Sequence, residues 1–304
     1  NGKLTKVTTT KAYMELVNKK VGTVTYTYND YLNTHQTGEI IYTYDSAGNI
    51  TRELTRIGYD KPNPKYSGME HVWTMIDDKD VQYTYTNGKL TKITTTEAYL
   101  ELVNKKVGSV TYTYNDYLNK HKTSEIIYTY DDIGNIKSMV NSVGYNKANP
   151  KSSGMEYIWS YRIKDQEEYS YNENHQIREI NKHSSYSDLV TKKVGTVTYT
   201  YHEYKTRQSE KIIYSYNEDC RMSDEKVYKY GYNDKNVWTS FLKEQKTYKY
   251  DNEGRLILVQ QYNFNKLVES IKYEYILDSN GYLTKQIIYK GIISNNNVSS
   301  YQKT

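Results

Sequence analysis

The residues whose chemistry could serve catalysis or metal binding are few, and their spacing does not assemble a site. The six histidines are His35, His71, His121, His175, His183 and His202. No two of them stand at the short intervals by which zinc sites collect their ligands. Cys220 is the one cysteine, so an intrachain disulfide is excluded, and the sequence places no histidine beside it to act as a base. We therefore expect no metal, no cofactor and no catalytic residue.

Three lysine pairs are candidates for a binding surface, because they recur at one place in an internal repeat. They are Lys19-Lys20, Lys105-Lys106 and Lys192-Lys193. A row of such pairs would attract an anionic polymer or lipid headgroups, with an affinity that falls as salt rises. Lysines at hairpin tips are also commonly solvated, or they guard a strand edge against pairing with another chain. Both interpretations stay open.

The tyrosines form a second candidate surface. The chain has 38 tyrosines but only 2 phenylalanines, and Tyr-X-Tyr tripeptides place two phenol rings on one face of a strand. The candidate residues are Tyr26, Tyr28, Tyr42, Tyr44, Tyr112, Tyr114, Tyr128, Tyr130, Tyr199 and Tyr201. Rings stacked across strands would stabilise a sheet with little core, by about 0.2–1 kcal/mol per pair. Exposed rings would instead offer a platform for sugar rings or a partner protein.

These residues recur because the chain contains tandem copies of one unit. Residues 1–86 align with 87–172 without a gap, with 54 identities. A divergent third copy occupies 173–251, and 252–304 form a partial repeat and a C-terminal cap. The second copy is preceded by a strand that has no counterpart before Asn1, so we expect the first copy to lack its first strand.

Alternating apolar and polar residues predict half-buried strands. In the first copy we predict six, at about 3–17, 22–32, 38–45, 49–58, 69–76 and 80–86, with a bulge near Thr10. Asn87-Gly88 is typical of a two-residue hairpin turn, and Asp45–Asn49 suits a longer one. Residues 77–80 are interpreted as a hairpin tip rather than a calcium loop, because the second copy loses their carboxylates. Lys61–Pro64 is predicted to lie outside the ladder.

The predicted fold class is all-β: an antiparallel meander of tandem β-hairpin repeats, with about twenty strands, forming an extended or wound sheet. A two-sheet sandwich or a closed barrel is the alternative. Apolar residues make up 37% of the chain, which predicts a thin core. The net charge of +5 is too small to indicate a specific nucleic-acid partner. No apolar run reaches membrane-spanning length.

Four segments resemble a known bacterial repeat. Residues 248–256 read YKYDNEGRL and resemble the tyrosine–aspartate (YD) repeat, YxYDxxGRL, of Rhs-like proteins. Residues 42–50 (YTYDSAGNI) and 128–136 (YTYDDIGNI) resemble it as well, and 214–222 (YSYNEDCRM) is a decayed version. The resemblance implies a secreted, periplasmic or cell-surface bacterial protein built from β-hairpins. It also implies repeats without catalytic residues, which in large members of the family wrap a toxin.

The sequence therefore predicts a non-catalytic structural or adhesive repeat module of a secreted or cell-surface bacterial protein, presenting an elongated Tyr-rich β surface. The expected partner is a cell-surface polysaccharide or another protein. Two alternatives stay open: a carbohydrate-binding module that uses Tyr platforms, and a segment of a toxin-encapsulating YD-repeat shell.

Overall fold

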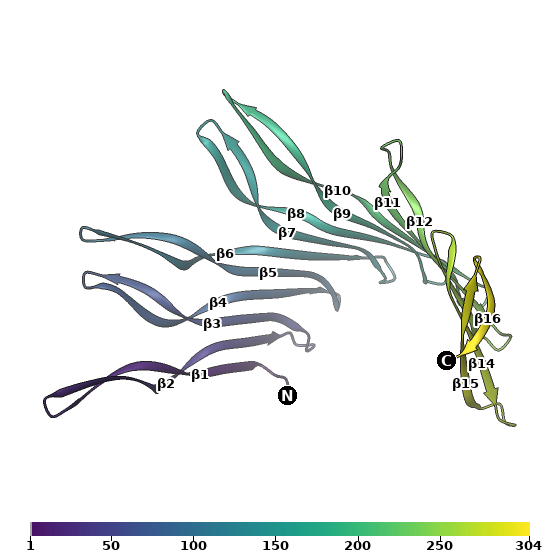
Figure 1. Cartoon of the computed structure of the whole chain (residues 1–304), viewed down its shortest axis with the longest axis horizontal. Helices are drawn as coiled ribbons and strands as arrows, with labels where there is room; N and C mark the ends of the chain where they lie inside the picture. Colours follow the sequence, from purple (N-terminus) through teal and green to yellow (C-terminus); the bar gives the residue numbers. More distant parts are fainter. Residues whose placement is uncertain (1) are drawn as a thin grey trace. The chain divides into compact units, whose positions relative to one another are not determined.

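The computed structural model describes residues 2–304, except for the side chains of residues 13–17, 29 and 31–33. They form sixteen strands that follow chain order in one antiparallel sheet (Figure 1). The strands are β1 (Lys6–Val21), β2 (Val24–Tyr44), β3 (Ile50–Lys65), β4 (Gly68–Thr86), β5 (Lys89–Val107), β6 (Val110–Tyr130), β7 (Ile136–Lys151), β8 (Gly154–Tyr171), β9 (Ile177–Val194), β10 (Val197–Tyr216), β11 (Met222–Tyr232), β12 (Trp238–Tyr250), β13 (Leu256–Asn263), β14 (Lys266–Leu277), β15 (Leu283–Ser294) and β16 (Asn297–Lys303). The predicted all-β antiparallel meander is confirmed. Across residues 2–304, no helix has the length and apolar character that crossing a bilayer requires.

The strands fall into two compact units. Unit 1 contains the residues up to 128 together with 141–162, and unit 2 contains 129–140 and 163–304. Within unit 1 the hairpins β1–β2 and β5–β6 have the same register, since Lys6 pairs with Ile41 and Lys92 with Ile127. The bulge expected near Thr10 is confirmed by a register shift between Thr9 and Thr10. The repeat boundaries stay a prediction, and the expectation about Asn1 lies outside the described residues.

Each pair of strands forms a long hairpin with two distinct ends. The distal ends close in two-residue turns at Gly22–Thr23, Tyr66–Ser67 and Gly108–Ser109, and the proximal turns join one hairpin to the next. β4 pairs with β5 only from Lys79 to Thr86, so the described register leaves residues 68–77 paired with β3 alone. The distal half of a hairpin is therefore a two-stranded ribbon, as Figure 1 shows for the hairpins of unit 1.

The predicted count of six strands in the first copy is wrong, as is the total of about twenty. The segments expected to separate strands are bulges inside longer strands. β2 continues through residues 33–38, because within this segment its register with β1 skips only Thr37. β4 continues through residues 77–80, because its register with β3 skips only Asp78. The polar side chains of this second segment stay in the sheet because Arg56 and Arg52 pair with Asp77 and Asp80.

The prediction that Lys61–Pro64 cannot join a ladder is also wrong. Pro62 and Pro64 lie in β3, opposite His71 and Met69 of β4. Neither proline has an N–H to donate, and both lie beyond the last residue of β3 that pairs with β2. Because β3 pairs with β2 only up to Ile57, they face an open edge, where no N–H donor is needed.

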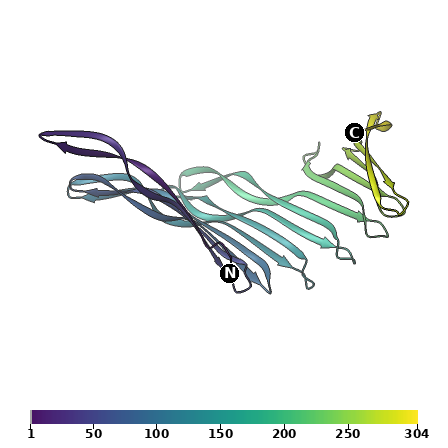
Figure 2. The same cartoon turned by 90° about the horizontal axis from the view of Figure 1, so that it is seen from below.

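The hydrophobic core is thin, as predicted. Among the described side chains, the buried aliphatic ones are Leu54, Val81, Ile212 and Leu267, and Pro64 and Pro150 are buried as well. Leu54 lies in the middle of the sheet, since it pairs with Ile41 on one side and Asp80 on the other. The hairpins twist along their length, which Figure 2 shows from below. With so little apolar burial, hydrogen bonds and ion pairs between strands must hold the sheet together.

Candidate functional site

The turn at Asp45 explains the Asp and Gly of the YD-like motif. The Asp45 carboxylate accepts the backbone N–H of Asn49 at 2.8 Å and its side-chain amide at 2.9 Å. These donors, the amide first, lower the pKa of Asp45. Gly48 takes a φ of 94°, a conformation that L side chains rarely adopt. Asp45 is therefore a turn-forming group rather than a free acid.

The same turn, with a backbone hydrogen bond to the residue four positions later, recurs along the described chain. It begins at Asp45, Asp131, Asn172, Asn217, Asn233, Asp251 and Asp278. The sequence motif finds the turns at 45, 131, 217 and 251, and Asp278–Gly281 reads as a turn. The sequence motif misses the turns at Asn172 and Asn233, where His175 and Asn236 take positive φ in place of glycine. An Asx residue followed by any residue that tolerates positive φ is the signal that would have found them.

The second tyrosine of Tyr-X-Tyr closes the proximal end of its hairpin. Tyr44, at the end of β2, donates its hydroxyl to the carbonyl of Leu4, just before β1, at 2.7 Å. The equivalent pairs are Tyr85–Ile50, Tyr171–Ile136, Tyr216–Ile177, Tyr250–Met222 and Tyr275–Leu256, at 2.7–3.1 Å. We call this contact the base staple. It explains why tyrosine, and not phenylalanine, precedes the turn.

The three tryptophans link one hairpin to the one before it, and sequence reasoning missed this role. Trp73 of β4 donates its indole N–H to the carbonyl of Gln36, at the bulge of β2, at 3.2 Å. The indole crosses Gly58 of β3, where a Cβ atom would lie 2.5 Å from the ring. Trp159–Lys122 and Trp238–Gln208 repeat the bond at 3.2 and 3.1 Å. The bulge residue before each carbonyl packs on the indole: His35, His121 and Arg207.

Several charged side chains of unit 1 lie close together near the bulges of β2 and β4. Glu39 is buried and pairs with Lys6 and, at 3.1 Å, with Arg56. The Lys6 ammonium is the largest cause that lowers the pKa of Glu39, and burial opposes it. Arg56 and Lys120 both reach Asp77, at 2.9 and 2.8 Å. These opposite charges neutralise one another, so the cluster stabilises cross-strand pairing.

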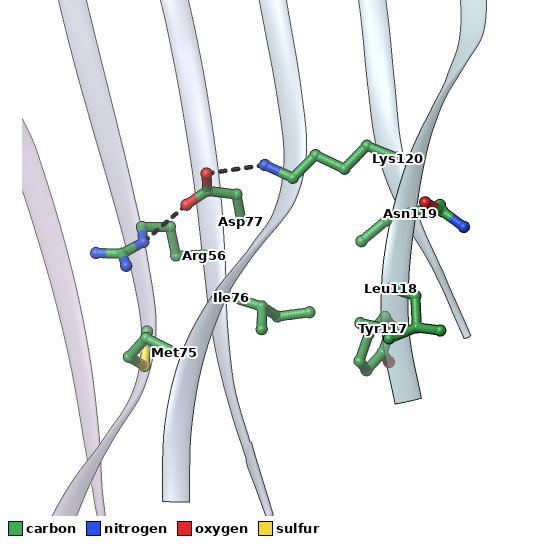
Figure 3. A pocket seen from close by; sticks show the side chains of 9 residues that line it. Arg56, Met75, Ile76, Asp77, Tyr117, Leu118, Asn119 and Lys120 are labelled. Carbon is green, nitrogen blue, oxygen red and sulfur yellow. Dashed lines mark hydrogen bonds and ion pairs between the residues drawn. The ribbon is translucent and has the colours of Figure 1, made fainter. Parts of the chain in front are cut away.

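A cavity of about 290 Å³ lies beside this cluster, between the ribbons β3–β4 and β5–β6. Figure 3 shows Arg56 and Lys120 approaching Asp77 from opposite sides, above Ile76. The lining residues are Arg56, Met75, Ile76, Asp77, Ala98, Tyr117, Leu118, Asn119 and Lys120. All three of its charged side chains are engaged with one another, so they do not form an acid–base pair poised for a substrate.

Asp116, the residue before the cavity-lining Tyr117, joins the two ribbons. The Tyr59 hydroxyl donates to this buried carboxylate at 2.5 Å, and Lys61 lies 3.7 Å from it. Burial, and then the bond to Asp116, raise the pKa of Tyr59. Tyr59 also packs edge-to-face on Tyr117, with ring centroids 5.1 Å apart. This contact fixes the distance between neighbouring ribbons.

The candidate tyrosines are distributed unequally between buried and exposed positions. Tyr42, Tyr44, Tyr112, Tyr114, Tyr128, Tyr130, Tyr199 and Tyr201 are half-buried. Tyr112 is held by a 3.2 Å hydrogen bond to the carbonyl of Lys65 in the neighbouring ribbon. Tyr26 and Tyr28 are 54% and 39% exposed. The surface that sequence alone treats as one row is thus mostly engaged within the sheet, and open only at the first hairpin.

The candidate lysines flank the distal turns. Lys19, Lys20, Lys105, Lys106, Lys192 and Lys193 are all exposed. Within residues 2–304, the ammonium groups of the six form no ion pair. Their charge is therefore available to an anionic partner.

The residues first considered for chemistry lie apart. Cys220 is exposed at a turn position with a φ of 60°, where it replaces the glycine of the motif, and its sulfur accepts the Asn174 side-chain amide at 3.0 Å. Across residues 2–304, histidine, cysteine and carboxylate side chains form no group of three that could hold a metal ion.

Comparison with known proteins gives no family. No family model matches the chain, and no curated protein is similar to it. Among solved structures, a porin-like protein from Bacteroides uniformis ATCC 8492 aligns at 12% identity over 88% of this chain and 86% of the other, with a TM-score of 0.31. TcdB2-TccC3-TEV aligns at 11% identity over 87% of this chain and 15% of the other, with a TM-score of 0.27. Similarity this low supports no statement about function.

Proposed function

We propose that the chain is a non-catalytic structural repeat module of a secreted or cell-surface bacterial protein, which presents a Tyr-rich β surface. The base staple carries this proposal. Six tyrosine hydroxyls form the same bond at six hairpin bases. Residues that recur with the same backbone partner serve the fold, whereas an active site needs a constellation of roles assembled at one place.

We further infer that the hairpins are of the YD-repeat kind. The Asp of the motif accepts the N–H groups of its own turn, and the Gly takes positive φ, at Asp45–Gly48, Asp131–Gly134 and Asp251–Gly254. The preceding tyrosine forms the base staple at Tyr44 and Tyr250. The second Tyr, the Asp and the Gly of the motif therefore each have a physical role in this chain, which supports the bacterial, extracytoplasmic origin that the resemblance implies.

A carbohydrate-binding module is the second candidate, and the exposure of two tyrosines favours it. Tyr26 is 54% and Tyr66 is 87% exposed, and both rings lie at distal ends in unit 1. An exposed phenol offers a flat apolar face on which a sugar ring can stack.

A glycan array with the whole chain separates the two functions. The structural function predicts equal, background retention for the wild type and for Tyr26→Ala, Tyr66→Ala and Tyr282→Ala. Tyr282 is the control, because it is 71% exposed and belongs to unit 2. If one glycan class is retained by the wild type and by Tyr282→Ala, but not by the other two variants, the carbohydrate function replaces the structural one.

A further inference from the structure

The distal ends of three hairpins in unit 1 lie on one side of the sheet. In a meander the turns alternate between the two sides of the sheet, so the turns of β1–β2, β3–β4 and β5–β6 lie on the same side (Figure 1). We call residues 19–26, 65–68 and 102–110 the distal rim. The Tyr66 ring lies over Gly108, where a Cβ atom would be 2.6 Å from it, so the second and third ends touch.

The distal rim exposes an unusual amount of apolar side chain. Its exposed apolar residues are Val21 (57%), Val24 (50%), Tyr26 (54%), Tyr66 (87%), Leu102 (68%) and Val110 (50%). Isolated exposed apolar residues are normal, but a cluster at neighbouring hairpin ends marks an interaction site. Most of them are aliphatic, so the partner must offer an apolar environment.

The same rim is purely basic. Its three segments contain no Asp or Glu, and they include Lys19, Lys20, Lys105 and Lys106. These four ammonium groups have no carboxylate partner in the described chain, whereas Lys65 is paired with Glu70 at 2.5 Å. The partner must therefore also carry negative charge.

We propose that the distal rim docks on the headgroup region of an anionic lipid bilayer. Lysines near such a surface are attracted to acidic headgroups, aliphatic side chains enter the acyl boundary, and tyrosine favours the interface between them. An anionic polysaccharide would satisfy the lysines but would leave Leu102 and Val21 in water. The proposal rests on the proposed function, because it names the partner of the surface that the module presents.

The pattern occurs again in unit 2. Lys192 and Lys193 precede the distal turn of β9–β10, beside Leu189 at 67% and Val197 at 43% exposure. The equivalent of Leu102 is thus exposed again although this copy is divergent. Conservation of fold alone does not require an exposed leucine beside a lysine pair.

Vesicle co-sedimentation of the whole chain tests the proposal. We expect partition onto phosphatidylcholine vesicles with roughly a third phosphatidylglycerol to exceed that onto pure phosphatidylcholine by at least about tenfold. The variant with Gln at Lys19, Lys20, Lys105 and Lys106 should lose about tenfold or more of this partition. The matched control has Gln at Lys235, Lys249, Lys285 and Lys303, which are exposed lysines of unit 2, and should change it by less than about twofold.

A second variant, Leu102→Ser with Val110→Ser, tests the apolar part without changing charge. It should also weaken vesicle binding, while circular dichroism reports an intact β fold for every variant. Equal losses in the four-lysine variant and its control overturn the proposal. Vesicle binding that the serine variant does not weaken, together with equally strong binding to soluble dextran sulfate, also overturns the proposal. That result would identify a polyanion as the partner. Absence of binding to any vesicle also overturns it, and leaves the structural function to be judged by the glycan array.

Discussion

At the scale of residues, tyrosine has a defined role that its aromatic ring alone does not explain. In the base staple the ring lies half-buried on the sheet and the hydroxyl satisfies a carbonyl at the start of the same hairpin. Tyr248 shows a related arrangement, since burial, followed by the charge of Glu225, raises its pKa to about 12. The Tyr248 hydroxyl therefore stays protonated at neutral pH and remains a donor, here to the Glu225 carboxylate.

Removing one staple should weaken the sheet measurably. Tyr250→Phe deletes the donor to the Met222 carbonyl, a bond of 2.9 Å. The loss of a neutral hydrogen bond should lower the free energy of unfolding by about 0.5–1.5 kcal/mol, read from the urea midpoint. Tyr282→Phe is the control, because its side chain is 71% exposed. If both variants unfold at the same urea concentration, the staple does not stabilise the hairpin.

The glycine beneath Trp73 makes a second prediction. Gly58→Ala would place a Cβ atom 2.5 Å from the Trp73 ring and 2.6 Å from the Gln36 carbonyl. Overpacking of this kind should destabilise the protein by about 1–3 kcal/mol. Gly38→Ala is the matched control, because its nearest neighbour would lie 3.9 Å away. Thermal unfolding of the two variants checks the prediction, and equal melting temperatures would contradict the tryptophan link.

At the scale of elements, bulges decide how the strands are used. At the bulges near Gln36, Lys122 and Gln208 the strand bends without ending, and the carbonyl of each of these residues accepts an indole N–H from the next hairpin. Several ion pairs of unit 1 also lie near these bulges. Glu39, Asp77 and Glu125 each accept a lysine ammonium, which is the largest cause that lowers their pKa.

These carboxylates predict a stability that depends on pH. Their folded pKa values lie below the unfolded ones, so they stabilise the sheet above an unfolded pKa of about 4, and this contribution disappears as pH falls through the folded values. Urea midpoints should therefore drop progressively as the pH falls below about 5. Glu39→Gln should reduce the drop, and Glu173→Gln, at an exposed turn residue, should not. An identical acid profile for both would contradict the role of the ion pairs.

At the scale of the whole molecule, the fold is a chain of local contacts. Strands pair with their neighbours in sequence, so stability arises from each hairpin and from its interface with the next. Inside unit 1, the proximal halves of β3 and β4 pair with a strand on each side. Their distal halves pair only with each other.

This difference predicts uneven hydrogen exchange. Backbone amides at residues 52–57 and 79–82 lie between two strands, and those at 58–61, 63, 65 and 68–76 lie in a ribbon. Exchange at neutral pH should be slower in the first group by at least about tenfold, because opening a ribbon breaks fewer contacts. Uniform protection along β3 and β4 would show that the ribbons are as stable as the sheet.

The sequence by itself determined the all-β class, the meander order and most of the turns. Alternation with period two and local turn chemistry at Asp45–Asn49 and Asn87-Gly88 act over a few residues, so they can be read without a structure. The candidate lysines and tyrosines were also chosen from local sequence patterns, but those patterns did not predict which of their side chains are exposed.

Only the tertiary structure decided the number of strands and the partners of the aromatic side chains. The polar segments 33–38 and 77–80 resemble turns, and it is pairing with a neighbouring strand that keeps them in the sheet. Trp73 bonds a carbonyl 37 positions away, and Tyr44 one 40 positions away. No local pattern encodes such a contact, because it depends on which strands the register brings side by side.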